Sequence, residues 1–146
     1  LNMYLNKVLD ILNNDISKNK VKIFNKIPKE CYIDFNPSYL ESILLNFTTN
    51  AIKYSHPERV PEIMYNHYLE NGKVVLEIQD NGLGIDLARH GDKLFGMYKT
   101  FHKNENARGI GLFITKNQIE SMGGSVTVDS KTNKGTTFKI YFNNEI

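Results

Sequence analysis

Apolar side chains recur at helical spacing in the first sixteen residues of the chain. Leu5, Val8 and Leu12 fall on one face of a helix over 1–16, and the polar pair at 19–20 ends the pattern. Residues 1–18 are therefore predicted to be the tail of a longer upstream helix or a linker. The rest of the chain, 19–146, is predicted to be one domain.

Several later segments alternate apolar and polar side chains, which is the two-residue period of a strand. Strands are predicted over 21–27, 31–35, 63–69, 73–79, 126–128 and 136–142. Asn71-Gly72 suits a tight hairpin turn between two of these strands. A second turn, which contains Gly135, joins the last two.

Two longer segments have the spacing of amphipathic helices. Asn36-Pro37 is a helix start, with Asn as the cap and Pro in the first turn. The apolar stripe of this helix reaches about Tyr54 and consists of Leu40, Ile43, Leu44, Phe47 and Ala51. A second helix is predicted over 111–122, closed by Gly123-Gly124.

Helices mixed with antiparallel hairpins predict an α+β fold, a two-layer sandwich. A doubly wound parallel sheet is disfavoured, because two of the strand pairs have connections too short for a crossover helix. Residues 85–108 contain glycine and several polar residues and are predicted to be mostly a mobile loop.

The composition is that of an ordinary globular domain, with 40% hydrophobic and 23% charged residues among 146. The net charge of +2 and the scattered basic residues argue against binding of nucleic acid or of a membrane by this domain. Cys31, the single cysteine, cannot form an internal disulfide and fits a reducing cytoplasm as a small buried hydrophobe. No apolar run approaches the length of a membrane span, and the start at Leu1 indicates a piece of a longer protein, which leaves a membrane anchor in the parent open.

Asn46, Asn50 and Lys53 share one face of the helix that starts at Asn36. Asparagine inside a helix has a local cost. An asparagine carbonyl is a hard oxygen ligand that can hold Mg²⁺, and a nearby lysine can neutralise phosphate. A solvated polar face would give the same pattern, and both interpretations stay open on this motif alone.

Two turns with glycines could supply the rest of a nucleotide site. Asp80 ends an apolar strand and could accept a hydrogen bond from an exocyclic amine such as that of adenine, while the glycines at 82 and 84 let the backbone approach a planar ring. Gly109 and Gly111 free backbone amides at a helix N-terminus, which suits phosphate. Each motif alone is also compatible with an ordinary Asx turn or a flexible helix entry.

Taken in this order, the three motifs resemble the Bergerat-type ATPase fold shared by histidine kinases, type II topoisomerases, the ninety-kilodalton heat-shock chaperones and mismatch-repair ATPases. The resemblance to the histidine kinase branch is close and covers roughly residues 20–142. The matching segments are Asn46–Ser55 for the N-box, Asp80–Ile85 for the first glycine box, Leu94–Lys99 for the phenylalanine box, Gly109–Leu112 for the second glycine box and Gly135–Phe138 for the final strand.

This resemblance implies a mixed, mostly antiparallel sheet covered on one face by helices, and a site for ATP and Mg²⁺. Asn50 would ligate the ion with the support of Asn46, Asp80 would read the adenine amine, and Asn46 and Lys53 would serve phosphoryl transfer. The other residues assigned to the nucleotide are Tyr54, Gly82, Gly84, Ile85, Phe95, Lys99, Arg108, Gly109, Gly111, Leu112 and Thr137.

The resemblance also implies an ATP lid over about 86–108, anchored by Phe95. Two departures stand out. Ala107 takes a place where the second glycine box often has a glycine. No phosphoacceptor box is found, because none of the histidines has the following acidic residue and helical proline pattern: His56, His67, His90 and His102.

Hydrolytic members of the superfamily resemble one another in placing a glutamate, the general base for water, one helical turn before the metal-binding asparagine. Here Asn46 takes that place and cannot accept a proton, which favours transfer of the γ-phosphoryl to a histidine. We therefore expect the catalytic domain of a two-component sensor histidine kinase, with its acceptor on a separate dimerisation domain and a response regulator downstream. Two alternatives stay open: an ATP hydrolase of this superfamily, and a nucleotide-binding pseudokinase module used for docking.

Overall fold

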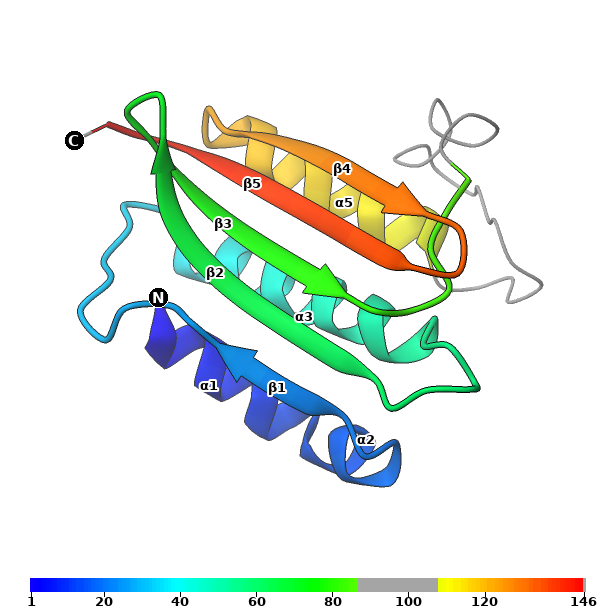
Figure 1. Cartoon of the computed structure of the whole chain (residues 1–146). Coiled ribbons are helices and arrows are strands. Elements are labelled where there is room, and N and C mark those ends of the chain that lie inside the picture. Colours follow the sequence, from blue (N-terminus) through cyan, green and yellow to red (C-terminus); the bar gives the residue numbers. More distant parts are fainter. Residues whose placement is uncertain (87–107, 146) are drawn as a thin grey trace.

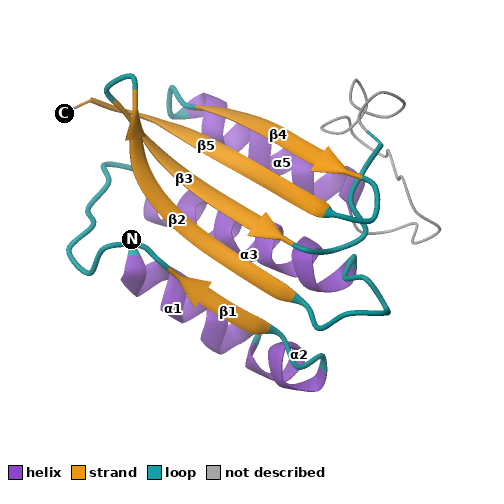
Figure 2. Ribbon diagram, viewed as in Figure 1, coloured by secondary structure: helices purple, strands orange, loops and turns teal. Residues whose placement is uncertain are grey.

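The computed structural model describes residues 1–86 and 108–145, which form a five-stranded sheet with helices on one face (Figure 1). The strand order is β1-β2-β3-β5-β4. β1 is parallel to β2, and the other neighbours are antiparallel. The helices form one layer behind the sheet (Figure 2). The predicted two-layer α+β sandwich, with its mostly antiparallel sheet, is confirmed.

The strands span Lys22–Asn25 (β1), Glu62–Glu70 (β2), Lys73–Asp80 (β3), Ser125–Lys131 (β4) and Gly135–Glu145 (β5). The predicted hairpin between β2 and β3 is confirmed, and its turn residues Asn71 and Gly72 have φ of 53° and 80°. Positive φ at both positions is what a two-residue turn of this hand requires. β1 can be parallel to β2 because the chain passes through a helix between them.

The helices span Asn2–Ile11 (α1), Asn13–Lys18 (α2), Pro37–Lys53 (α3) and Arg108–Ser121 (α5). The first predicted helix is divided in two at Leu12. The predicted start of α3 is confirmed, since the Asn36 side chain accepts a hydrogen bond from the Tyr39 N–H at 3.1 Å. Within the described ranges, no helix is long and apolar enough to cross a membrane.

The core lies between the sheet and α3, the middle helix of the layer. Phe47 of α3 packs at a tilt on Phe138 of β5, with ring centroids 4.5 Å apart. α1 packs on α3 and contributes Leu5 and Val8, both fully buried. The first residues of the chain therefore share one core with the domain that follows them.

No strand forms over 31–35, so that prediction is wrong. Burial alternates there as expected: Cys31 is buried, and Phe35 packs edge-on against Phe142 at 5.2 Å. The Cys31 carbonyl, however, accepts a hydrogen bond from the amino group of Leu1 at 2.9 Å. The segment crosses from β1 to α3 instead of running along a sheet edge (Figure 1), so it has no ladder to join.

Candidate functional site

The Asp80 turn (residues 80–84) lies against the C-terminal end of α3. The Gly82 N–H donates to Asp80 Oδ1 at 2.9 Å, and the Leu83 N–H donates to the Tyr54 carbonyl at 2.9 Å. A Cβ on Gly82 would stand 2.5 Å from that same carbonyl oxygen. The fold thus brings the first glycine box to the end of the helix that carries Asn50.

The Asp80 turn also packs on the β4–β5 turn (residues 131–135). The Asn133 N–H donates to the Leu83 carbonyl at 2.6 Å. Gly84 has a φ of 74°, and a Cβ on it would stand 2.0 Å from the Lys131 carbonyl oxygen. Ile85 is buried, and its N–H donates to Ser130 Oγ at 2.8 Å. Both glycines of the box are therefore needed for backbone packing, in addition to any contact with a nucleotide.

Asn50 and Asn46 project from α3 into two different settings. Asn50 is 5% exposed, and its Nδ2 has no hydrogen-bond partner among the described residues. Asn46 is half-buried, and its Nδ2 donates to Thr115 Oγ1 on α5 at 3.1 Å. The alternative of a solvated polar face does not hold for these two residues. A buried amide donor left unpaired costs roughly 1–3 kcal/mol, so the setting of Asn50 suits a polar ligand.

Lys53 and Tyr54, at the end of α3, differ in exposure. Tyr54 is 3% exposed, and its backbone carbonyl holds the Asp80 turn. Lys53 is exposed and lines a cavity of about 410 Å³ together with Asp15 and Asn19 from the α2 region. Lys53 therefore borders α2 in this structure.

The second glycine box forms the first turn of α5. This helix begins at Arg108, earlier than the predicted start at 111, so Gly109 and Gly111 lie inside its first turn. The first four N–H groups of a helix have no acceptor within it and attract anions. Leu112, which follows, is fully buried and anchors this end of α5 in the core.

The predicted lid residues Phe95 and Lys99 lie outside the described residues. Both belong to the predicted lid over 86–108, and of that segment only the two ends are described.

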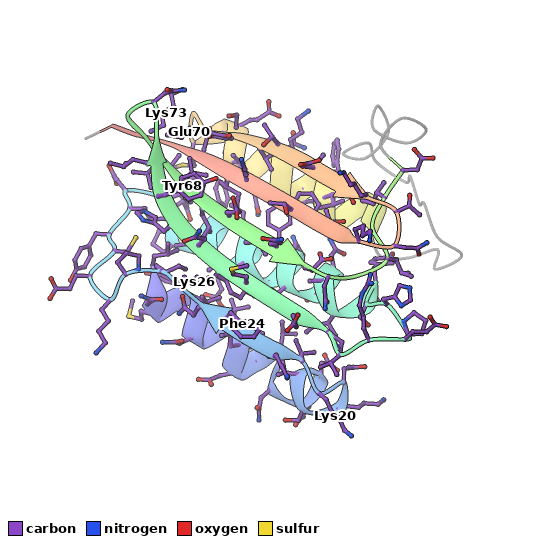
Figure 3. All side chains as sticks on the ribbon, in the orientation of Figure 1. Lys20, Phe24, Lys26, Tyr68, Glu70 and Lys73 are labelled. Atoms are coloured by element: carbon purple, nitrogen blue, oxygen red, sulfur yellow. The ribbon has the colours of Figure 1, made fainter. Side chains whose placement is uncertain are left out.

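The structure separates Thr137 from Thr136. Thr136 pairs with Asp80 in the β3–β5 ladder, is 3% exposed, and has its Oγ1 2.8 Å from Ser130 Oγ. Thr137 pairs with Gln79 and, by strand alternation, faces the opposite side of the sheet. That open side carries Phe24, Lys26 and Tyr68 (Figure 3).

Thr136, which is not among the residues predicted for the site, therefore shares the face of Asp80. The alternation from the apolar position 138 was the signal that could have indicated it.

Comparisons with known proteins identify the family of the chain. Residues 35–146 match the family described as histidine kinase-, DNA gyrase B-, and HSP90-like ATPase. Over 117 residues the chain is 36% identical to the signal transduction histidine-protein kinase ArlS of Staphylococcus haemolyticus (strain JCSC1435). It is 35% identical to ArlS of Staphylococcus aureus (strain USA300). These matches cover 78% of this chain but 25% and 26% of the two relatives, so the chain spans about a quarter of their length.

Solved structures show the same fold. The catalytic domain of histidine kinase ThkA has a TM-score of 0.81 at 19% identity, over 97% of this chain and 92% of that chain. Full-length ShkA in complex with AMPPNP has a TM-score of 0.75 at 22% identity, over 98% of this chain and 30% of that chain. The expected Bergerat fold and the resemblance to the histidine kinase branch are confirmed.

Proposed function

Since the chain belongs to the histidine kinase-, DNA gyrase B- and HSP90-like ATPases, we propose that it is the ATP-binding catalytic domain of a sensor histidine kinase. The observation that carries the proposal is the contact between the Asp80 turn and the end of α3, made through the Leu83 N–H and the Tyr54 carbonyl. It brings the turn that carries the Asp80 carboxylate against the helix that carries the buried Asn50 amide. A nucleotide would use the first group for its base and the second for its metal-bound phosphates. A neighbour in fold, ShkA, is in complex with AMPPNP, which supports the same kind of ligand here.

At the base end, Asp80 would accept a hydrogen bond from the adenine amine. The Gly82 N–H bond to Oδ1 orients the carboxylate. Thr136 on β5 pairs with Asp80 on β3 and adds a hydroxyl on the same face of the sheet. Ordered dipoles of this kind recognise a base without having to rearrange on binding.

At the phosphate end, Asn50 would hold Mg²⁺ through Oδ1, and its unpaired Nδ2 would donate to a phosphate oxygen. When bound, Mg²⁺ offsets the charge that develops on the phosphoryl group. The amides of the first turn of α5 would bind the phosphates. The Asn46–Thr115 hydrogen bond joins α3 to α5, the two helices that would supply these ligands. The described residues contain no group of three or more His, Cys, Asp or Glu side chains that could hold a metal ion.

The reaction would be transfer of the γ-phosphoryl to a histidine of the parent kinase's dimerisation domain, for relay to a response regulator. Asn46 cannot act as a base toward water, which supports transfer over hydrolysis. Residues 1–18 would connect the domain to an upstream helix.

Asp80→Asn tests the adenine assignment. The amide presents a donor to the adenine amine where the carboxylate presents only acceptors, so binding of Mg-ATP is expected to be lost from the micromolar-to-millimolar range typical of enzymes. Asp129→Asn on β4, an exposed carboxylate, makes the same chemical change as a control. Wild-type affinity in Asp80→Asn, measured by calorimetry, would contradict the assignment.

A second experiment separates the kinase from its alternatives. The chain is mixed with the separately made dimerisation domain and γ-labelled ATP, and acid-labile phosphohistidine is expected on that domain. Steady release of phosphate by the chain alone, without phosphohistidine, would instead indicate a hydrolase. A chain that binds no nucleotide at all would indicate a docking module.

A further inference from the structure

Arg59 connects the Asp80 turn to the β4–β5 turn. Its Nε donates to the Asn81 carbonyl at 2.6 Å, and its Nη2 donates to the Gly82 carbonyl at 2.9 Å. The same Nη2 donates to the Asn133 carbonyl at 2.5 Å. Asn81 and Gly82 belong to the Asp80 turn, and Asn133 belongs to the β4–β5 turn. One guanidinium therefore binds three carbonyls from two segments that are distant in the sequence.

We propose that Arg59 is a positioning residue for adenine recognition, which holds the backbone that orients the Asp80 carboxylate. Arg59 lies in none of the motifs that carry the family resemblance. The inference rests on the proposed function, because adenine is the partner assigned to Asp80 there.

The peptide unit between Asn81 and Gly82 makes the connection. Its carbonyl accepts from Arg59 Nε at 2.6 Å, and its N–H donates to Asp80 Oδ1 at 2.9 Å. A peptide unit is planar, so its two ends rotate together. Holding the carbonyl with Arg59 thus also fixes the N–H that orients the carboxylate.

Two further backbone donors of the Asp80 turn are bonded to neighbouring elements, and Arg59 binds the carbonyls of Asn81 and Gly82. The Asn81 N–H donates to the Glu62 carbonyl at 3.3 Å, and the Leu83 N–H donates to the Tyr54 carbonyl at 2.9 Å. α3 and β2 therefore hold two backbone donors of the turn, while Arg59 holds the carbonyls of Asn81 and Gly82.

The loop that carries Arg59 is itself ordered by hydrogen bonds. His56 Nδ1 accepts from the Glu58 N–H at 3.1 Å. The Asn81 side chain joins the loop to the turn, since its Nδ2 donates to the Val60 carbonyl at 3.0 Å and its Oδ1 accepts from the Glu62 N–H at 2.8 Å. The Arg59 backbone is thus placed beside the turn before its side chain binds, which lowers the entropy lost in forming the three bonds.

The chemistry of the side chain explains why arginine is required. A guanidinium presents five donors in a planar fork, whereas the lysine ammonium is a compact point charge on a flexible stem. Arg59→Lys keeps the positive charge but cannot reproduce the planar fork of donors. Arg59→Gln removes both the charge and the fork. Loss of one or two bonds from a charged donor is expected to weaken ATP binding about tenfold.

The test compares ATP with GTP for wild type, Arg59→Lys and Arg59→Gln by calorimetry. Guanine carries a carbonyl where adenine carries the amine, so GTP bound in the same pose has no donor for the Asp80 carboxylate at that position. The preference for ATP over GTP is expected to fall about tenfold in both variants, with GTP affinity nearly unchanged. A variant that is only less stable loses affinity for both nucleotides by one factor and keeps the ratio. Lys134→Gln, which removes a positive charge from the β4–β5 turn, is the control and is expected to keep it as well.

Amide hydrogen exchange supplies a readout that needs no nucleotide. The N–H groups of Leu83 and Asn133, which join the two turns to their neighbours, are expected to exchange about tenfold faster in Arg59→Gln. An unchanged ATP-to-GTP ratio in both Arg59 variants, or unchanged exchange, would overturn the proposal. A wild-type chain without preference for ATP would overturn the adenine assignment of the proposed function and the role of Arg59 in it, while exchange would still show whether Arg59 holds the turn.

Discussion

Two glycines with similar backbone angles have different surroundings. Gly84 has a φ of 74° and a backbone oxygen of Lys131 2.0 Å from where a Cβ would stand. Gly72 has a φ of 80° and nothing within 4 Å of that position. In the sequence both are glycines of a turn, and only the packing of the Asp80 turn on the β4–β5 turn distinguishes them.

Gly84→Ala and Gly72→Ala are therefore expected to differ in stability. The left-handed conformation costs an alanine roughly 1–2 kcal/mol at either position. At Gly84 the collision with backbone adds to this, for a total loss of roughly 2–5 kcal/mol in the free energy of unfolding. Urea denaturation of the two variants measures the difference, and equal losses would show that the β4–β5 turn gives way to the new methyl group.

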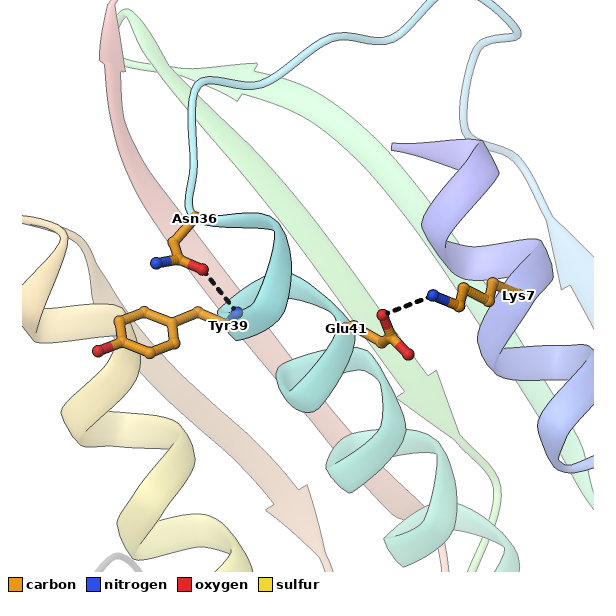
Figure 4. A network of polar contacts seen from close by, with 4 residues as sticks. All are labelled: Lys7, Asn36, Tyr39 and Glu41. Atoms are coloured by element: carbon orange, nitrogen blue, oxygen red, sulfur yellow. Dashed lines mark hydrogen bonds and ion pairs between the residues drawn. The ribbon is translucent and has the colours of Figure 1, made fainter.

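At the scale of elements, α3 carries Asn46 and Asn50 and is held by a cap and by an ion pair with a neighbouring helix. Asn36 caps its start through the 3.1 Å bond to the Tyr39 N–H, and Lys7 Nζ of α1 lies 3.2 Å from Glu41 Oε2 (Figure 4). The cap satisfies a donor that has no partner within the helix. The ion pair joins side chains that are 60% and 30% exposed, so solvent weakens it.

The cap is accordingly expected to contribute more than the ion pair. Asn36→Ala should lower the free energy of unfolding by about 1 kcal/mol, and Glu41→Ala by roughly 0–1 kcal/mol. Added salt should shrink the effect of Glu41→Ala and leave that of Asn36→Ala unchanged. Chemical denaturation at low and high salt tests both, and a larger loss in Glu41→Ala would refute the ranking.

For the whole molecule, His67 of β2 makes stability depend on pH. Its Nε2 is buried and has no partner among the described residues. Burial, and to a smaller degree the positive charge of the N-terminus, lowers the pKa of His67 from 6.5. The folded state therefore favours the neutral imidazole, and protonation favours unfolding.

The sign of the effect follows from proton binding. Just below pH 6.5 the unfolded state binds a proton at His67 that the folded state does not, so stability rises with pH across this window. The wild-type chain is expected to lose more stability than His67→Gln between about pH 7.5 and about pH 5.5. The two proteins differ only at position 67, so the difference isolates His67. Urea denaturation at the two pH values decides, and equal losses in the two proteins would remove His67 as the cause.

Much of the fold and part of the site follow from short-range features of the sequence. Asn36-Pro37 starts α3, and Asn71-Gly72 turns the β2–β3 hairpin, because each depends on the backbone preferences of one or two residues. The order of the asparagine and glycine motifs was enough to identify the family, because these residues lie in contiguous boxes.

The tertiary structure decided what depends on residues that are distant in the sequence. Residues 31–35 have the alternation of a strand but meet no sheet edge. Asn46 and Thr115, 69 positions apart, join α3 to α5, and Arg59 reaches the Asn133 carbonyl 74 positions away. Sequence patterns report which residues favour a helix, a strand or burial. Which carbonyl a guanidinium meets, and which threonine lies beside Asp80, are set by strand register and by the packing of turns, and these exist only once the chain has folded.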